Sequence, residues 1–260
     1  MLTTSATYRI IARDLDRSLE QKAAEQSIAR ETDYYLNNIS NINSIDDFMK
    51  NARVYNYAMK AFGLEDMAYA KAYMRKILVE GVEDSNSLAN RVSDDRFVRF
   101  ATVFNFARDG EATTTTTESG QGVVGRYVRQ ALETSAGLEN EGVRLALYFL
   151  REAPKATSAY DLLADPALWQ VVKTVFGFPD EMATAAIDKQ AAAVLQRLDL
   201  ADLKDPEKLD RLITKFTAVY DVTEVTAQDP VLSLFDLSAP SASVGLDLIL
   251  KLNNLRHGGS

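Results

Sequence analysis

One glycine-rich stretch of this chain has the spacing of a dinucleotide-binding loop. Gly120, Gly122 and Gly125 match the pattern G-x-G-x-x-G, in which glycines let the backbone approach a pyrophosphate. Such a site needs a hydrophobic strand before the glycines and alternating strands and helices after them. Residues 113–119 are instead polar, and no such alternation follows. We therefore interpret the glycines as part of a connecting segment and predict no nucleotide cofactor.

Other side chains that could take part in catalysis or metal binding are scarce or have a simpler role. His257 is the only histidine and there is no cysteine, so disulfides, thiol catalysis and cysteine-ligated metals are excluded. The closest carboxylate pairs are Asp46-Asp47 and Asp94-Asp95. Both follow a serine at a predicted helix start, where acidic groups favour the positive end of the helix dipole. We expect helix capping there, with no metal site and no enzymatic activity.

Composition narrows the class of protein further. The 260 residues are 47% hydrophobic, which is enough for a real core. A formal charge of −8 argues against a nucleic-acid partner, because phosphate binding needs a clustered basic surface. No apolar run approaches 18 residues, so we predict no membrane span. Residues 1–13 lack the basic and apolar regions of a cleavable signal peptide.

The apolar residues recur with helical spacing almost throughout the chain, which predicts an all-α fold. Residues 8–38 contain no glycine or proline, and we predict one long amphipathic helix there, broken at most once. This helix packs in the chain's own core or assembles with helices of other chains. Its apolar residues are Ile11, Leu15, Leu19, Ala23 and Ile28.

Two stretches of the sequence match at an offset of 114, the separation of Phe62-Gly63 from Phe176-Gly177. In each stretch a Ser-x-x-Asp capping box starts a short helix, a second N-cap starts the next helix, and a glycine ends it. Pro166 fits the first turn of the second of these helices. The matched cap positions are Ser44 and Ser158, Asn51 and Asp165, and Gly63 and Gly177.

We therefore predict two tandem degenerate repeats of a multi-helix unit, over residues 8–106 and 122–222. The two units share one core or form two. Residues 107–121, with five consecutive threonines, are predicted to be a flexible or extended linker. Residues 223–260 are predicted to be a flexible tail with a short apolar helix, which packs on its own domain or docks on a partner. The docking residues would be Val244, Leu248, Ile249, Leu252 and Leu255.

Four segments carry a family resemblance: residues 44–48, 61–66, 88–91 and 100–104. They resemble domain-of-unknown-function family 1217, whose members occur in alphaproteobacteria, often within flagellar gene clusters. The resemblance covers most of residues 8–222 and brings no catalytic residues with it. It implies a non-enzymatic accessory or structural interaction protein of the flagellum and motility, whose partners are flagellar components or further copies of itself.

An expected location and one alternative function complete the prediction. The protein is expected in the cytoplasm, or exported to or associated with the flagellum without a cleavable signal peptide. The alternative function is a helical module that binds a small molecule or a peptide between the two repeats.

Overall fold

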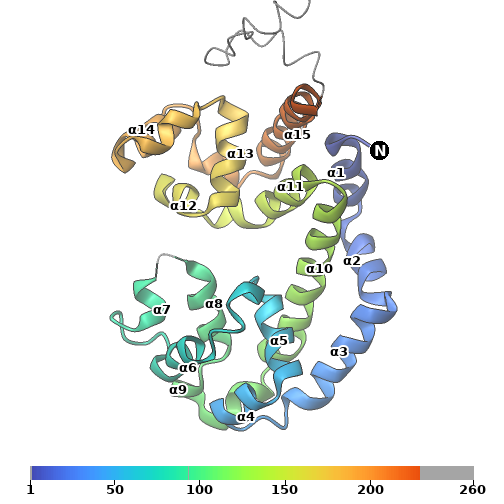
Figure 1. The fold of residues 1–260 in the computed structure, drawn as a ribbon, viewed down its shortest axis with the longest axis vertical. Coiled ribbons are helices and arrows are strands. Elements are labelled where there is room, and N and C mark those ends of the chain that lie inside the picture. The colour runs from blue at the N-terminus through green and yellow to red at the C-terminus, as the bar shows by residue number, and fades with distance from the viewer. Residues whose placement is uncertain (1, 93, 229–260) are drawn as a thin grey trace, which may run out of the picture. The chain divides into compact units, whose positions relative to one another are not determined.

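The computed structural model describes residues 2–92 and 94–228. All regular elements in this part of the chain are helices, which confirms the predicted all-α fold (Figure 1). The chain divides into a unit of residues 1–220 and a second unit of residues 221–260. The predicted docking stripe from Val244 to Leu255 lies outside the described residues.

The N-terminal region is broken twice, so the prediction of a helix with at most one break is wrong. The breaks fall at Asp14 and Glu25. At the first break the Asp14 carboxylate accepts a hydrogen bond from the backbone N–H of Arg17, at 3.2 Å. Local capping of this kind competes with a continuous helix. The three helices are α1 (Thr4–Arg13), α2 (Leu15–Ala24) and α3 (Gln26–Ile39).

The first predicted copy continues through six further α-helices. Its predicted N-caps are confirmed: the Ser44 hydroxyl accepts a hydrogen bond from the Asp47 N–H at 3.1 Å, and the Asn51 side chain accepts one from Val54 at 3.2 Å. The helices are α4 (Ile45–Lys50), α5 (Ala52–Ala61), α6 (Lys71–Glu80), α7 (Leu88–Arg91), α8 (Asp95–Val103) and α9 (Phe106–Asp109).

The second predicted copy contains the remaining α-helices of the described residues. Ser158 and Asp161 form the predicted capping box, Asp165 caps the next helix, and Gly177 ends it in the left-handed conformation with φ 61°. The helices are α10 (Val123–Glu139), α11 (Glu141–Glu152), α12 (Ala159–Ala164), α13 (Pro166–Phe176), α14 (Ile187–Leu195) and α15 (Pro206–Gln228). Helix α15 thus continues past the predicted boundary at residue 222.

Matching contacts support the predicted repeat. Helices α4 and α12 have six residues each and lie 114 residues apart, and each packs on the helix that follows it. The Tyr34 hydroxyl reaches the cap residue Asn51 at 3.5 Å, and Tyr148, at the same offset, donates to Asp165 at 2.6 Å. The repeat itself and the boundaries of its two copies stay a prediction.

The segment predicted to be a flexible or extended linker is helical, so that prediction is wrong. It forms a 3-10 helix over Gly110–Thr115 and a π-helix over Glu118–Gly122. Threonine hydroxyls donate to carbonyls three residues back, as Thr113 does to Gly110 at 2.8 Å, and such bonds stabilise the turns. The buried Thr114 hydroxyl also donates to the Ile42 carbonyl at 2.6 Å, which fixes the segment against the first copy.

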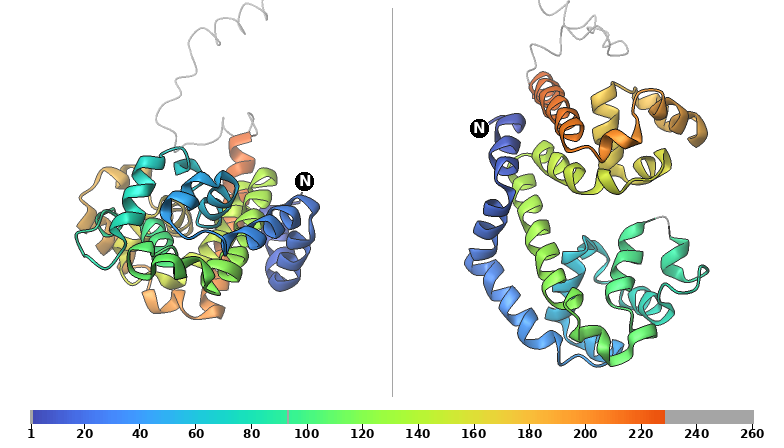
Figure 2. Two further views of the ribbon diagram at one scale, coloured as in Figure 1. Left: turned by 90° about the horizontal axis from the view of Figure 1, so that it is seen from below. Right: turned by 180° about the vertical axis from the view of Figure 1, so that it is seen from behind.

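The buried apolar residues form two core clusters, and each cluster includes a helix from the other copy. The first cluster contains Val123 and Tyr127 of α10 together with residues of helices α3 to α9. The second contains Tyr8 of α1 together with residues of helices α10 to α15. Helix α10 lies between α2 on one side and α5 on the other (Figures 1 and 2). The two predicted copies therefore interlock through α1 and α10.

Candidate docking groove on helix α5

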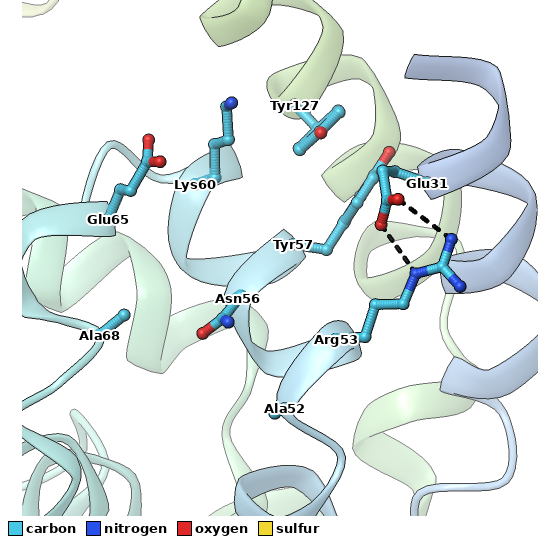
Figure 3. A pocket seen from close by; sticks show the side chains of 9 residues that line it. All are labelled: Glu31, Ala52, Arg53, Asn56, Tyr57, Lys60, Glu65, Ala68 and Tyr127. Carbon is cyan, nitrogen blue, oxygen red and sulfur yellow. Dashed lines mark hydrogen bonds and ion pairs between the residues drawn. The ribbon is translucent and has the colours of Figure 1, made fainter. Parts of the chain in front are cut away.

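A groove runs along the exposed face of helix α5 (Figure 3). Its volume of about 540 Å³ lies within the usual range of ligand pockets. Five lining residues share the spacing i, i+1, i+4, i+5, i+8, which places them on one helix face. The lining residues are Glu31, Ala52, Arg53, Asn56, Tyr57, Lys60, Glu65, Ala68 and Tyr127.

Three stacked tyrosines support the groove from behind. The rings of Tyr35 and Tyr57 lie 4.4 Å apart and those of Tyr57 and Tyr127 lie 3.8 Å apart, within 17° of parallel. The stack joins α3, α5 and α10, and all three side chains are buried. Burial raises the pKa of the Tyr57 and Tyr127 hydroxyls, so both stay neutral at physiological pH. The groove therefore has a rigid, uncharged aromatic wall.

A bidentate ion pair closes one end of the groove. Nε and Nη2 of Arg53 donate to the Glu31 carboxylate at 2.8 and 3.0 Å, and the guanidinium lies 3.9 Å from the centroid of the Tyr34 ring. The hydrogen bond from Arg53 lowers the pKa of Glu31. Arg53 and Glu31 are already paired with each other. Their main role is therefore to form the wall at this end of the groove.

The other end presents polar groups that are not paired with each other. Among the described residues, neither Lys60 nor Glu65 has an ion-pair partner within 4.0 Å, and the Lys60 ammonium lies 5.6 Å from the centroid of the Tyr127 ring. The Asn56 amide is exposed between the two ends. A cation, an anion and an amide thus remain available to hydrogen-bond a bound molecule.

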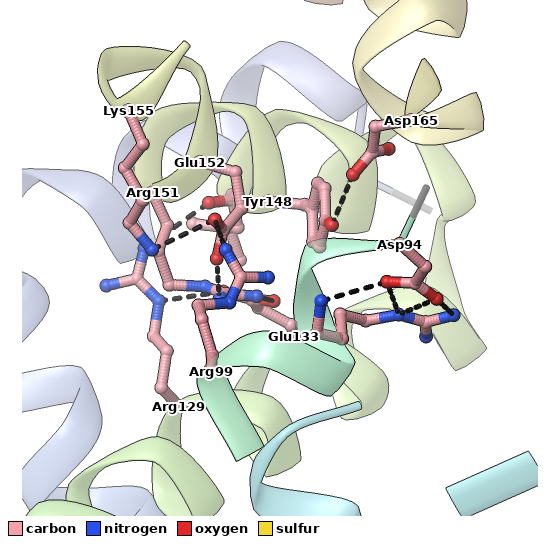
Figure 4. A network of polar contacts seen from close by, with 11 residues as sticks. Asp94, Arg99, Arg129, Glu133, Tyr148, Arg151, Glu152, Lys155 and Asp165 are labelled. Atoms are coloured by element: carbon pink, nitrogen blue, oxygen red, sulfur yellow. Dashed lines mark hydrogen bonds and ion pairs between the residues drawn. The ribbon is translucent and has the colours of Figure 1, made fainter. Parts of the chain in front are cut away.

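A second cluster of ionisable groups is buried between helices α8, α10 and α11 (Figure 4). The Glu133 carboxylate is almost completely buried, and it accepts hydrogen bonds from Nε of Arg129 at 2.9 Å and from Nε of Arg151 at 2.8 Å. Arg151 adds a second bond to Glu133 from Nη2, at 2.8 Å. Two guanidinium groups therefore hold this carboxylate through three hydrogen bonds.

Glu152 completes the network. It accepts hydrogen bonds from Arg99 of α8 and from Lys155, both at 2.9 Å, and it pairs with Arg151. Burial favours a higher pKa for Glu152, but the Arg151 and Arg99 guanidinium groups outweigh it and hold the pKa below its ordinary value. Because a general acid needs a raised pKa, this carboxylate has the character of a structural ion-pair centre. Arg99 and Glu152 tie the first core to the second.

The carboxylate pairs singled out in the sequence have capping and ion-pairing roles. Asp94 accepts a hydrogen bond from the Arg96 N–H at 3.0 Å at the start of α8, and Asp46 pairs with Arg75 at 2.5 Å. Gly120 and Gly122 lie in the π-helical turn and Gly125 lies in α10, so no strand precedes them. Within the described residues, no group of His, Asp and Glu side chains could hold a metal ion, and no helix is long and apolar enough to cross a membrane.

The sequence does not predict the α5 groove, and no sequence pattern singles out its aromatic residues, Tyr57 and Tyr127. The groove exists because Tyr127 of α10 packs on Tyr57 of α5, and these residues belong to different predicted copies. The sequence signal for this groove is the polar stripe of Arg53, Asn56 and Lys60 on one face of α5.

The fold and the groove define an all-α protein with a helix-lined surface suited to binding. A family model described as a protein of unknown function, DUF1217, matches residues 61–209, and the chain belongs to this family. The chain is also similar to a protein from Agrobacterium tumefaciens whose X-ray crystal structure was a target of the Northeast Structural Genomics Consortium. The two are 46% identical over 86% of this chain and 97% of the other, with a TM-score of 0.78. No curated protein matches the sequence.

Proposed function

We propose that this chain is a non-enzymatic helical interaction protein of the bacterial flagellum, and that a protein partner binds in the α5 groove. The docking role rests on a rigid tyrosine wall combined with polar groups of Asn56, Lys60 and Glu65 that are unpaired within the part of the chain that the structure describes. The motility role rests on the family resemblance described above. The ion-pair network is compatible with the non-enzymatic assignment, because its carboxylates are paired with guanidinium and ammonium groups.

The dimensions of the groove suit a polypeptide. The stripe from Ala52 to Lys60 extends about 12 Å along the helix axis, which matches two turns of a bound helix or about four extended residues. A polypeptide offers the apolar groups and the hydrogen-bonding groups that the groove complements. Tyrosine and arginine are also enriched among the residues that dominate binding energy at protein interfaces.

A second candidate function is binding of a small molecule or free peptide between the two predicted copies. One observation favours it: Tyr127 comes from the second copy, and the rest of the groove comes from the first. A ligand of this kind would raise the melting temperature, and the rise would grow with the logarithm of its concentration above Kd. An interaction protein would instead be stabilised by a protein partner.

The first test is affinity capture from motile cells with three baits. These are the full chain, the chain ending at Val222, and a full chain with Lys60→Glu and Glu65→Lys. We expect flagellar components on the full chain and their loss on the charge-reversed bait. Loss only on the truncated bait would place the interface on residues 223–260, and recovery of no flagellar component by any bait would favour the small-ligand function.

A genetic test addresses motility separately. Deletion of the gene is expected to impair swimming or flagellar assembly, and the unaltered gene is expected to restore it. Normal flagella and normal swimming in the deletion strain would remove the motility part of the proposal. The charge-reversed variant, supplied in place of the native gene, is expected to behave like the deletion.

A further inference from the structure

Helix α1 occupies a specific site in the second core. Tyr8 is almost completely buried there, and α1 packs on α11. The Thr4 hydroxyl is within 3.0 Å of the Asn140 amide nitrogen and 3.2 Å of its amide oxygen, at the N-cap of α11. The approach is so close that a Cβ atom on Gly142 would lie 2.8 Å from Thr4. Helix α1 is therefore closely packed in its site on α11.

The segment that connects α1 to the rest of the chain is held loosely by comparison. Helix α2 contains no buried residue, although it lies along α10. Its tie to α10 includes a hydrogen bond from Lys22 to the Ser135 hydroxyl at 2.8 Å. Segments with few buried apolar contacts open at low free-energy cost.

The break at Asp14 occurs without a helix-breaking residue. Residues 11–17 contain no glycine or proline, yet Asp14 has φ −142° and ψ 73°, outside the helical region. Each helix end at such a break leaves backbone groups without intrahelical partners. Straightening the chain at Asp14 would join α1 and α2 into one helix of about 31 Å and restore those hydrogen bonds.

We propose that α1 exchanges between two copies of this chain. In the exchanged dimer, each copy is straight at Asp14 and places its α1 in the α11 site of the other copy. Every contact of Tyr8 and Thr4 is preserved between chains, while the hinge gains helical hydrogen bonds. The monomer is favoured when dilute, because its own α1 is present at high effective concentration, and the dimer is favoured as the concentration rises.

The absence of cysteine in this chain allows a direct test. One preparation carries Thr4→Cys and a second, with a distinguishable tag, carries Asn140→Cys. The two are mixed at high concentration and oxidised, and a disulfide between the two chains is expected. The matched control replaces the exposed Ile10 of α1 with cysteine, paired with the same Asn140→Cys chain. Cross-linking no greater than in this control would overturn the proposal.

A hinge series provides a second measurement that does not require cysteines. Asp14→Ala removes the cap of α2 and favours a continuous helix, and because the hinge occurs twice per dimer, the dimer fraction is expected to rise with an association constant about tenfold or more higher. Asp14→Asn keeps the cap and should match the native chain, whereas Asp14→Gly opposes a continuous helix and should lower the dimer fraction. Native mass spectrometry measures the dimer fraction of each variant, and a fraction that stays at the native value in both Asp14→Ala and Asp14→Gly would overturn the proposal.

Discussion

Helices α5 and α13 lie at matching positions in the two predicted copies, but they carry different side chains. On α5 the stripe that faces the groove carries Arg53, Asn56 and Lys60. At the same register, 114 residues on, α13 carries Ala167, Gln170 and Thr174, which have no charge. The second copy instead places Glu133, Arg151 and Glu152 in a buried network. The α5 stripe therefore presents charges at an open groove, whereas the charges of Glu133 and Glu152 are buried and paired.

The largest expected effect comes from breaking the buried network. Glu133→Ala would leave Arg129 and Arg151 without their shared carboxylate, and loss of one partner of a buried ion pair costs about 3–5 kcal/mol. The control is Glu141→Ala, which removes the exposed partner of Arg144 and should cost about 1 kcal/mol or less. Urea denaturation measures both, and equal small losses would contradict the distinction between buried and open charges.

The next effect concerns how tightly the second copy packs around α1. Gly142→Ala would place a Cβ atom 2.5 Å from the Tyr220 ring, and overpacking of this kind costs roughly 1–3 kcal/mol. Gly125 lies inside α10 with no atom within 4 Å of its Cβ position, so Gly125→Ala should stabilise by about 0.5–1 kcal/mol. Thermal unfolding followed by circular dichroism should show shifts of opposite sign. Shifts of the same sign would mean that α1 is not packed as described.

The pH dependence of stability should report the buried network. The folded pKa of Glu152 lies below its unfolded value, so the native state binds fewer protons than the unfolded state at acidic pH. The stabilisation is complete above the ordinary carboxyl range of about pH 4 to 4.5 and is lost as the pH falls through the folded pKa. Glu152→Gln should make the acid limb of the stability curve shallower, whereas an unchanged limb would show that other carboxylates dominate it.

The smallest effect on stability is expected in the groove itself. Lys60→Glu and Thr174→Glu introduce the same side chain at matched positions of the two copies. Lys60 has no ion-pair partner among the described residues, so its replacement should change the free energy of unfolding by no more than about 0.5 kcal/mol. The same change should abolish partner capture, whereas Thr174→Glu should leave capture intact. A loss of capture in both variants would remove the distinction between the copies.

Features set by local sequence were predictable. The caps at Ser44, Asn51, Ser158 and Asp165 lie where capping chemistry places them, because each depends on a side chain and a backbone N–H only two or three residues away. The same holds for the end of α13 at Gly177, where a left-handed residue is needed.

Features set by distant packing were not predictable. The breaks at Asp14 and Glu25 lie in a stretch without glycine or proline, and the helices beside them dock on distant segments, α1 on α11 and α3 on α5. The threonine segment is helical partly because Thr114 bonds to Ile42, 72 residues earlier. The groove depends on contact between α10 and α5, which no local pattern encodes. Each error therefore concerns a contact between segments far apart in sequence.

The central claim is that the open charged face of α5 binds a protein partner and that the matched face of α13 does not. A photo-crosslinking amino acid at position 56 or at position 170, introduced in motile cells, tests this most directly. The account predicts a discrete adduct from position 56, identified by mass spectrometry as a flagellar component, and none from position 170. No adduct at position 56, or the same adduct from both positions, would contradict it.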